Sequence, residues 1–158
     1  MEIKLLDEKT QTEIDEIING AWDNSNENEE EYVEILLKAW DLYPNPKEQW
    51  SETYNLAKYI FHGYMDISNF KEAKKWLEKM TEVNNAYVAW NENSGYTEEL
   101  NFEAGKYYFE TGNYEEAYTS FREAVRASGG HNHFRYFDGE DKKYLEFYKK
   151  EKRIQDNK

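Results

Sequence analysis

The residues of this chain with the most obvious chemical potential are two histidines and many carboxylates. His131 and His133 lie two positions apart and could share a metal ion, but no matched carboxylate pattern accompanies them. The 33 Asp and Glu residues form many pairs at helical spacing, which is typical of a solvated surface in an acidic helical protein. We therefore expect neither a metal site nor a catalytic carboxylate pair.

Motifs of known enzyme sites are absent from the sequence. The chain has no phosphate-binding loop, no Gly-x-Ser-x-Gly motif and no His-Glu-x-x-His motif. It also has no cysteine, which excludes disulfides, thiol chemistry and Cys-based zinc sites. The sequence thus predicts a protein that is not an enzyme and that carries no cofactor.

Acidic residues are concentrated near the N-terminus. Residues 1–45 contain 13 Asp or Glu and 3 Lys, a net charge of −10, whereas residues 139–158 have a net charge of +2. An acidic run near the start has two interpretations: a solvated helix start that favours the positive end of the helix dipole, or a face that attracts a cationic partner. This run consists of Glu27, Glu29, Glu30, Glu31 and Glu34. Direct nucleic-acid binding is disfavoured because it needs clustered Lys and Arg.

The hydropathy of the chain predicts a cytoplasmic location. The N-terminal segment is too acidic, and its apolar run too short, for a signal peptide. No stretch approaches the ~20 apolar residues that a membrane span requires. We expect no association with a membrane.

Residues 98–131 show the periodicity of two helices joined by a tight turn. The second helix would bury Ala117, Phe121, Ala124 and Val125, which recur at steps of three and four. Gly105 is small where the first helix must approach the second, and Gly112 can take the positive φ angle of a turn. This stretch therefore predicts a helical hairpin.

The hairpin resembles a tetratricopeptide (TPR) repeat, whose signature places Leu-Gly-x-x-Tyr on the first helix and Ala-x-x-x-Phe on the second. Two weaker copies precede it, one around Gly20 to Pro44 and one that includes Asn69 to Leu77. In the latter copy Phe61 stands where the small residue is expected, so we expect that hairpin to be splayed or packed differently.

The resemblance implies an all-α fold, a short TPR-like α-solenoid in a single domain over residues 1–158. The domain would contain about three degenerate hairpins and a capping helix that covers the last exposed stripe. We place the hairpins at about residues 10–44, 47–83 and 97–128, and the capping helix at about 140–153. The loop His131–Asp138 precedes this last helix. Its side chains would either contact a partner or pack the loop onto the core.

TPR proteins bind peptides or protein segments in a groove lined by the first helix of each hairpin. Carried over by resemblance, the groove residues would be Asn55, Lys58, His62, Met65, Glu99, Phe102, Lys106 and Phe109. The second and third hairpins are separated by an insertion from about Asn84 to Tyr96, and in a second interpretation Phe102 and Phe109 pack on this insertion around Trp90. The set departs from the Lys and Asn pattern of grooves that grip a C-terminal carboxylate.

Two functions follow as expectations. The first is a non-catalytic adaptor or scaffold that binds a protein or peptide partner. The alternative is an acidic immunity-type inhibitor that occludes a basic bacterial toxin through the acidic run. A homodimer formed edge to edge through exposed aromatic residues is compatible with either function.

Overall fold

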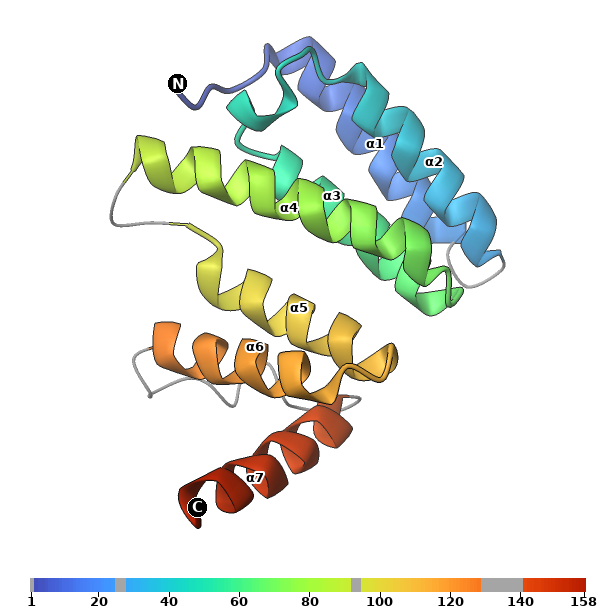
Figure 1. The fold of residues 1–158 in the computed structure, drawn as a ribbon. Helices are drawn as coiled ribbons and strands as arrows, with labels where there is room; N and C mark the ends of the chain where they lie inside the picture. Colours follow the sequence, from blue (N-terminus) through green and yellow to red (C-terminus); the bar gives the residue numbers. More distant parts are fainter. Residues whose placement is uncertain (1, 25–27, 92–94, 129–140) are drawn as a thin grey trace. The chain divides into compact units, whose positions relative to one another are not determined.

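The computed structural model describes residues 2–24, 28–91, 95–128 and 141–158, which divide into two compact units. Unit 1 is Met1–Gly95 and unit 2 is Tyr96–Lys158. The described residues form seven α-helices and one short 3-10 helix, with no strand among them (Figure 1). The helices are α1 (Glu8–Asn24), α2 (Glu29–Leu42), α3 (Thr53–Asp66), α4 (Phe70–Trp90), α5 (Thr97–Glu110), α6 (Tyr114–Ala127) and α7 (Lys142–Asp156), and the 3-10 helix η1 is Lys47–Gln49. The predicted all-α, TPR-like fold is confirmed.

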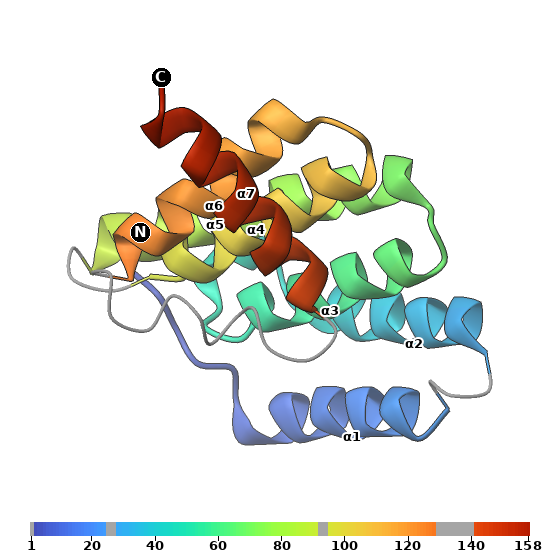
Figure 2. The same cartoon turned by 90° about the horizontal axis from the view of Figure 1, so that it is seen from below.

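Unit 1 consists of two helical hairpins, α1–α2 and α3–α4, and α2 also packs against α3 (Figure 2). Its fully buried core lies along the facing sides of these helices and includes Ile14, Leu36, Tyr54, Ile60, Phe61 and Met80. The N-terminal segment is held beside η1, because the Lys4 N–H donates to the Gln49 carbonyl at 2.7 Å and the Ser51 N–H donates to the Lys4 carbonyl at 3.1 Å. This tether brings residues before α1 close to the start of α3.

Gly63 makes the close approach between α2 and α3. A Cβ atom built on Gly63 would lie 2.5 Å from Cγ2 of Val33, well inside contact distance. Phe61, which replaces the glycine of the TPR pattern in this hairpin, is fully buried, and Leu77 occupies the position of the aromatic residue on the second helix. The small residue of this hairpin is therefore Gly63, two positions further along the chain and facing the preceding hairpin.

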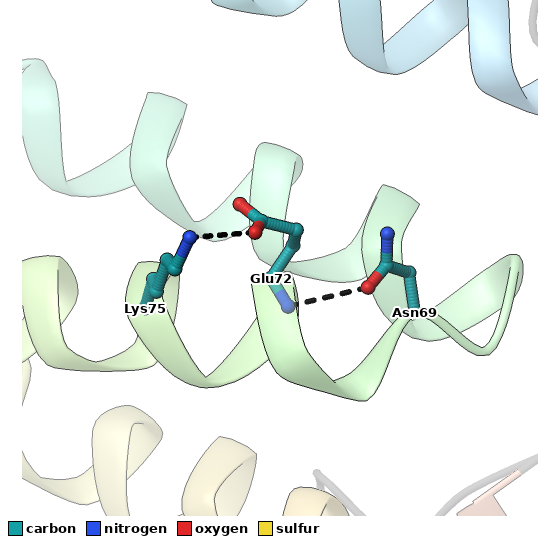
Figure 3. Close-up of polar contacts among 3 residues, drawn as sticks. All are labelled: Asn69, Glu72 and Lys75. Carbon is teal, nitrogen blue, oxygen red and sulfur yellow. Dashed lines mark hydrogen bonds and ion pairs between the residues drawn. The ribbon is translucent and has the colours of Figure 1, made fainter.

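The α3–α4 turn uses a serine in a left-handed conformation. Ser68 has φ 57°, and Gly112 takes φ 79° at the matching position of the α5–α6 turn. After Ser68, the Asn69 side chain caps α4 by accepting a hydrogen bond from the Glu72 N–H at 3.3 Å, and the Glu72 carboxylate pairs with Lys75 at 2.6 Å (Figure 3). The cap helps to fix the start of α4.

We expect Ser68→Gly to raise the free energy of unfolding by about 1 kcal/mol, because glycine adopts positive φ without the steric cost of a Cβ atom. Urea unfolding followed by circular dichroism would measure the change. Gly112→Ala is the matched control and should lower stability by a similar amount, since a Cβ at Gly112 meets nothing within 4 Å and only its φ of +79° opposes it. A loss of stability in the Ser68 variant would contradict this assignment.

The helix α4 is longer than expected. It continues to Trp90, seven residues beyond the predicted end of its hairpin at residue 83. Val83 and Asn84 are buried, so the first turn of the extension has a packed face, whereas Trp90 remains 45% exposed. Part of the insertion expected between the second and third hairpins is thus an extension of α4.

Unit 2 consists of the α5–α6 hairpin and α7. A Cβ atom on Gly105 would lie 2.5 Å from the Phe121 ring, so the glycine lets α5 approach α6 closely, as the pattern predicted. The helix α7 packs on α6 and contributes two tyrosines, Tyr144 and Tyr148, to a core that also contains Phe102 and Phe121. This arrangement confirms the predicted capping helix, which ends three residues later than expected.

Glu110 links the end of α5 to the start of α7. Its carboxylate accepts a hydrogen bond from the Tyr144 hydroxyl at 2.6 Å and forms an ion pair with Lys143. Burial raises the pKa of Glu110, but the hydrogen bonds from Lys143 and Tyr144 outweigh it and hold the pKa below its ordinary value. Burial and the hydrogen bond to this carboxylate raise the pKa of Tyr144 strongly. The ionised form of Glu110 is therefore favoured in the folded state.

We expect Glu110→Gln to make unit 2 less sensitive to acid. Because the folded pKa of Glu110 is depressed, its contribution to stability is complete above the unfolded pKa of about 4.3 and disappears as the pH falls through the lower folded value. The stability difference between wild type and variant should thus be largest near neutral pH and shrink below about pH 4. Urea unfolding at a series of pH values tests this, with Glu146→Gln, an exposed change on α7, as control. A difference that stays constant with pH would contradict the role of Glu110.

Candidate functional site

One cleft of unit 1 lies between α1 and α3, the first helices of its two hairpins. It has a volume of about 310 Å³. Its lining comes from five α1 residues, three α3 residues and two residues on the connecting segments: Gln11, Asp15, Ile18, Asn19, Trp22, Asn55, Leu56, Tyr59, Tyr43 and Glu52. The cleft therefore combines apolar and aromatic surface with a few polar groups, as binding sites commonly do.

Two aromatic rings form one end of this cleft. Trp22 of α1 and Tyr59 of α3 make an edge contact, with ring centroids 5.4 Å apart and planes at 77°. Trp22 also makes a hydrogen bond with the Tyr32 hydroxyl of α2, in which the indole N–H is the donor. Trp22 is nevertheless 47% exposed. Its ring is held on two sides and still presents a large apolar surface to solvent, which suits a contact with a partner.

The lining of the cleft also includes polar groups that are hydrogen-bonded to one another. Gln11 donates one hydrogen bond to Asp15 at 2.9 Å and a longer one to the Tyr43 hydroxyl at 3.4 Å. Burial raises the pKa of Tyr43, and the hydrogen bond from Gln11 only partly opposes this, so the phenol stays neutral at physiological pH. These groups can donate and accept hydrogen bonds and offer one negative charge.

A second depression extends the cleft towards the N-terminus. It has a volume of about 480 Å³ and shares Gln11, Asp15 and Glu52 with the first. Its other lining residues are Leu5, Leu6, Glu8 and Thr12, of which Leu5 is 80% exposed. We refer to the two depressions together as the α1/α3 groove. Within the part of the chain that the structure describes, every charged residue that lines it is acidic.

The groove residues predicted on the second hairpin lie in part at this site. Asn55 lines the cleft. Lys58 stands beside it, with Nζ 5.6 Å from the centroid of the Tyr59 ring. His62 and Met65 are half-buried further along α3 and do not line either depression.

The residues predicted on the third hairpin have a different setting. Phe102 is 3% exposed and belongs to the core of unit 2, where its ring lies 5.9 Å from Phe121 and 6.5 Å from Tyr144. The expectation that it faces an open groove is therefore corrected: α6 and α7 enclose it. Phe109 is partly buried against the rings of Tyr144 and Phe147, at 5.3 and 5.2 Å.

The polar residues of this set are less enclosed. Glu99 and Lys106 are half-buried on α5. The Lys106 ammonium pairs with Glu103 at 3.1 Å and lies 5.0 Å from the centre of the Phe102 ring. Lys106 is thus engaged within its own helix, and its availability to a partner stays a prediction.

The acidic alternative lies on the first two turns of α2. Glu29, Glu30, Glu31 and Glu34 are exposed, and the Asn28 side chain accepts a hydrogen bond from the Glu31 N–H at the start of this helix. Glu27 and the loop His131–Asp138, with both histidines considered as metal ligands, lie outside the described residues. Within the described ranges, no group of three or more His, Asp or Glu side chains could hold a metal ion.

The sequence analysis did not identify the residues that shape the groove most. Ile18 and Trp22 continue the helical spacing of the buried Ile14 at steps of four, so the stripe itself was visible in the sequence. The sequence did not show that the Trp22 end of this stripe is exposed, because the exposure of Trp22 depends on how α3 packs beside it. Tyr59 was overlooked for the same reason, since it flanks the buried stripe of α3.

Comparison with known proteins supports the fold assignment. Residues 98–131, which include α6 and all of α5 except its first residue, match the tetratricopeptide repeat family. A search of the curated proteins and a search of the solved structures found no match. No helix in the part of the chain that the structure describes is long and apolar enough to cross a membrane. The family match covers the third hairpin alone, and together with the helical hairpins of the described residues it supports a tetratricopeptide-repeat-like protein.

Proposed function

We propose that the chain is a non-catalytic, cytoplasmic module that binds a protein or peptide partner in the α1/α3 groove. TPR repeats generally mediate protein–protein interactions. The observation that carries the proposal is the position of the groove, between the first helices of two consecutive hairpins, with a Trp22 side chain that is 47% exposed at one end. An aromatic ring fixed by neighbours and open to solvent is the kind of residue that dominates binding energy at interfaces.

Affinity capture with groove variants tests this function. The tagged chain would be incubated with an extract of the source organism at low and high salt, and retained proteins would be identified by mass spectrometry. We expect a partner that is retained by wild type and lost with Trp22→Ala, because truncation of a central aromatic contact typically costs at least 2 kcal/mol, or about thirtyfold in affinity. Circular dichroism would confirm that the variant is folded. Retention of the same partners by both proteins would contradict the groove as the binding site.

The acidic immunity-type inhibitor is the second candidate. It is supported by the exposure of Glu29, Glu30, Glu31 and Glu34 on α2 and by the net charge of −11 that residues 1–95 carry, with 20 acidic and 9 basic residues. Such a surface would accelerate capture of a basic partner in a salt-dependent manner. In the capture experiment, this function predicts one basic protein that is lost when Glu29, Glu30 and Glu31 are changed to Lys and that is retained by Trp22→Ala.

A further inference from the structure

We infer that the α1/α3 groove takes an extended segment that carries a Lys or Arg followed or preceded, about three positions away, by a large apolar side chain. This inference rests on the proposed function and names the chemistry of the partner. It follows from three features of the groove: the sign of its charges, the placement of its exposed apolar residues, and the distance between the two.

The charges of the groove all have one sign. Glu8, Asp15 and Glu52 line it, and no Lys, Arg or His of the described residues does. Asp15 and Glu52 line both depressions, so they stand where the two join. Both side chains are exposed, so the protein itself does not bury and dehydrate either carboxylate. An incoming cation could therefore pair with them at little desolvation cost. A carboxylate of a partner would meet repulsion at the same place.

Apolar surface lies on both sides of this acidic junction. At one end the Trp22 and Tyr59 rings meet, and at the other Leu5 is 80% exposed. Ile18 and Leu56 line the cleft between the junction and the rings. A segment in the groove would therefore place a charged side chain at the centre and an apolar side chain beside the Trp22–Tyr59 pair.

The spacing follows from helix geometry. Asp15 and Trp22 are seven residues apart on α1, which corresponds to about 10 Å along the helix axis. A segment in the extended polyproline II conformation advances about 3.1 Å per residue and returns its side chains to the same face every three residues. The basic and apolar side chains of the segment are thus about three residues apart.

Lys58 distinguishes this partner from a peptide recognised by its carboxylate. Its ammonium lies 5.6 Å from the Tyr59 ring centroid, beside the cleft but not in its lining. A groove for a carboxylate would use this cation. A groove for a basic segment would be hindered by it, since like charges repel across the short distance to the Trp22–Tyr59 end.

Selection from a displayed library of random peptides on the full chain tests the inference. The expected result is enrichment of peptides with Lys or Arg about three positions from Trp, Phe, Leu or Met. A synthetic amidated peptide of the enriched sequence would then be measured by fluorescence anisotropy. We expect the double change Asp15→Asn and Glu52→Gln to weaken it about three- to tenfold, as loss of two exposed ion pairs implies, and Lys58→Gln to strengthen it. Glu146→Gln, which removes one negative charge from α7, should leave its affinity unchanged.

The outcomes separate this inference from the proposed function. Enriched peptides that are acidic, or that need a free C-terminal carboxylate and lose affinity with Lys58→Gln, would overturn the basic-segment inference while leaving the groove in place, provided that Trp22→Ala abolishes their binding. Peptides that bind Trp22→Ala as well as wild type, or no enrichment at all, would overturn both. The basic-segment inference would also be overturned if the groove bound the basic C-terminal helix of a second copy of the chain. Sedimentation of the wild-type chain with and without the peptide would reveal such self-association.

Discussion

Phe102→Ala is expected to lower the free energy of unfolding of unit 2 by about 3–5 kcal/mol, the range for truncation of a buried phenylalanine. The ring is 3% exposed and lies between Phe121 of α6 and Tyr144 of α7. Its removal would leave a cavity that reaches both neighbouring helices. Since small domains have only about 5–15 kcal/mol of stability, this loss is a large fraction of the total.

Urea unfolding of the wild type and variant would measure this loss. Phe109→Ala is the matched control, because Phe109 is also aromatic and on α5 but only partly buried, and its truncation should cost less. Equal effects of the two substitutions, or a Phe102 variant as stable as wild type, would contradict the packing of α5 against α6 and α7. A loss of partner binding in Phe102→Ala should accordingly be attributed to unfolding rather than to a lost contact.

Gly105→Ala is expected to lower stability by about 1–3 kcal/mol, as overpacking of a filled core does. The new Cβ atom would lie 2.5 Å from two atoms of the Phe121 ring, which is itself fully buried and cannot move without displacing its own neighbours. Gly20→Ala is the control, because a Cβ there meets nothing within 4 Å. That change should instead stabilise α1 by about 0.5–1 kcal/mol, the usual gain from replacing glycine within a helix.

A double-mutant cycle identifies the clash as the cause. In a Phe121→Leu background the ring is gone, so Gly105→Ala should cost less, with a coupling energy above about 0.5 kcal/mol. The second hairpin already carries Leu77 at the position of Phe121 and a buried Phe61 at the position of Gly105. Additive effects of the two substitutions would contradict the close contact.

The third hairpin could be predicted from the sequence because its signals are local. Gly105, Gly112, Ala117 and Phe121 stand at spacings that a helix–turn–helix requires, and each has the expected burial or φ angle. The second hairpin was less clear from the sequence for two reasons. Ser68 occupies the turn position at which the third hairpin has Gly112, and the residue that permits close helix approach is Gly63, two positions beyond the expected one. A serine at positive φ gives no signal in a propensity pattern, because non-glycine residues other than Asn and Asp seldom take this conformation.

The candidate site was harder to predict because it depends on which side chains remain uncovered. The resemblance to TPR proteins correctly placed Asn55 at the cleft. It also placed Phe102 in an open groove, although α7 helps to bury this residue. The helical period marks which residues share a face, but not whether another element packs on that face. Trp22 and Phe102 are both aromatic residues on the first helix of a hairpin. Trp22 stays exposed because α3 covers only part of its ring, whereas Phe102 is buried because α6 and α7 pack over it.

The most direct test of a binding groove on α1 and α3 is an NMR spectrum of the ¹⁵N-labelled chain with and without the captured partner. The indole N–H of Trp22 would be assigned from a Trp22→Phe variant, and the buried Trp76, at 6% exposure, provides an internal reference. We predict that the Trp22 signal and the backbone amides of Asp15, Asn55 and Tyr59 shift or broaden, while Trp76 does not. Changes confined to Glu29–Glu34 of α2, with the Trp22 signal unmoved, would contradict the groove and favour the acidic face.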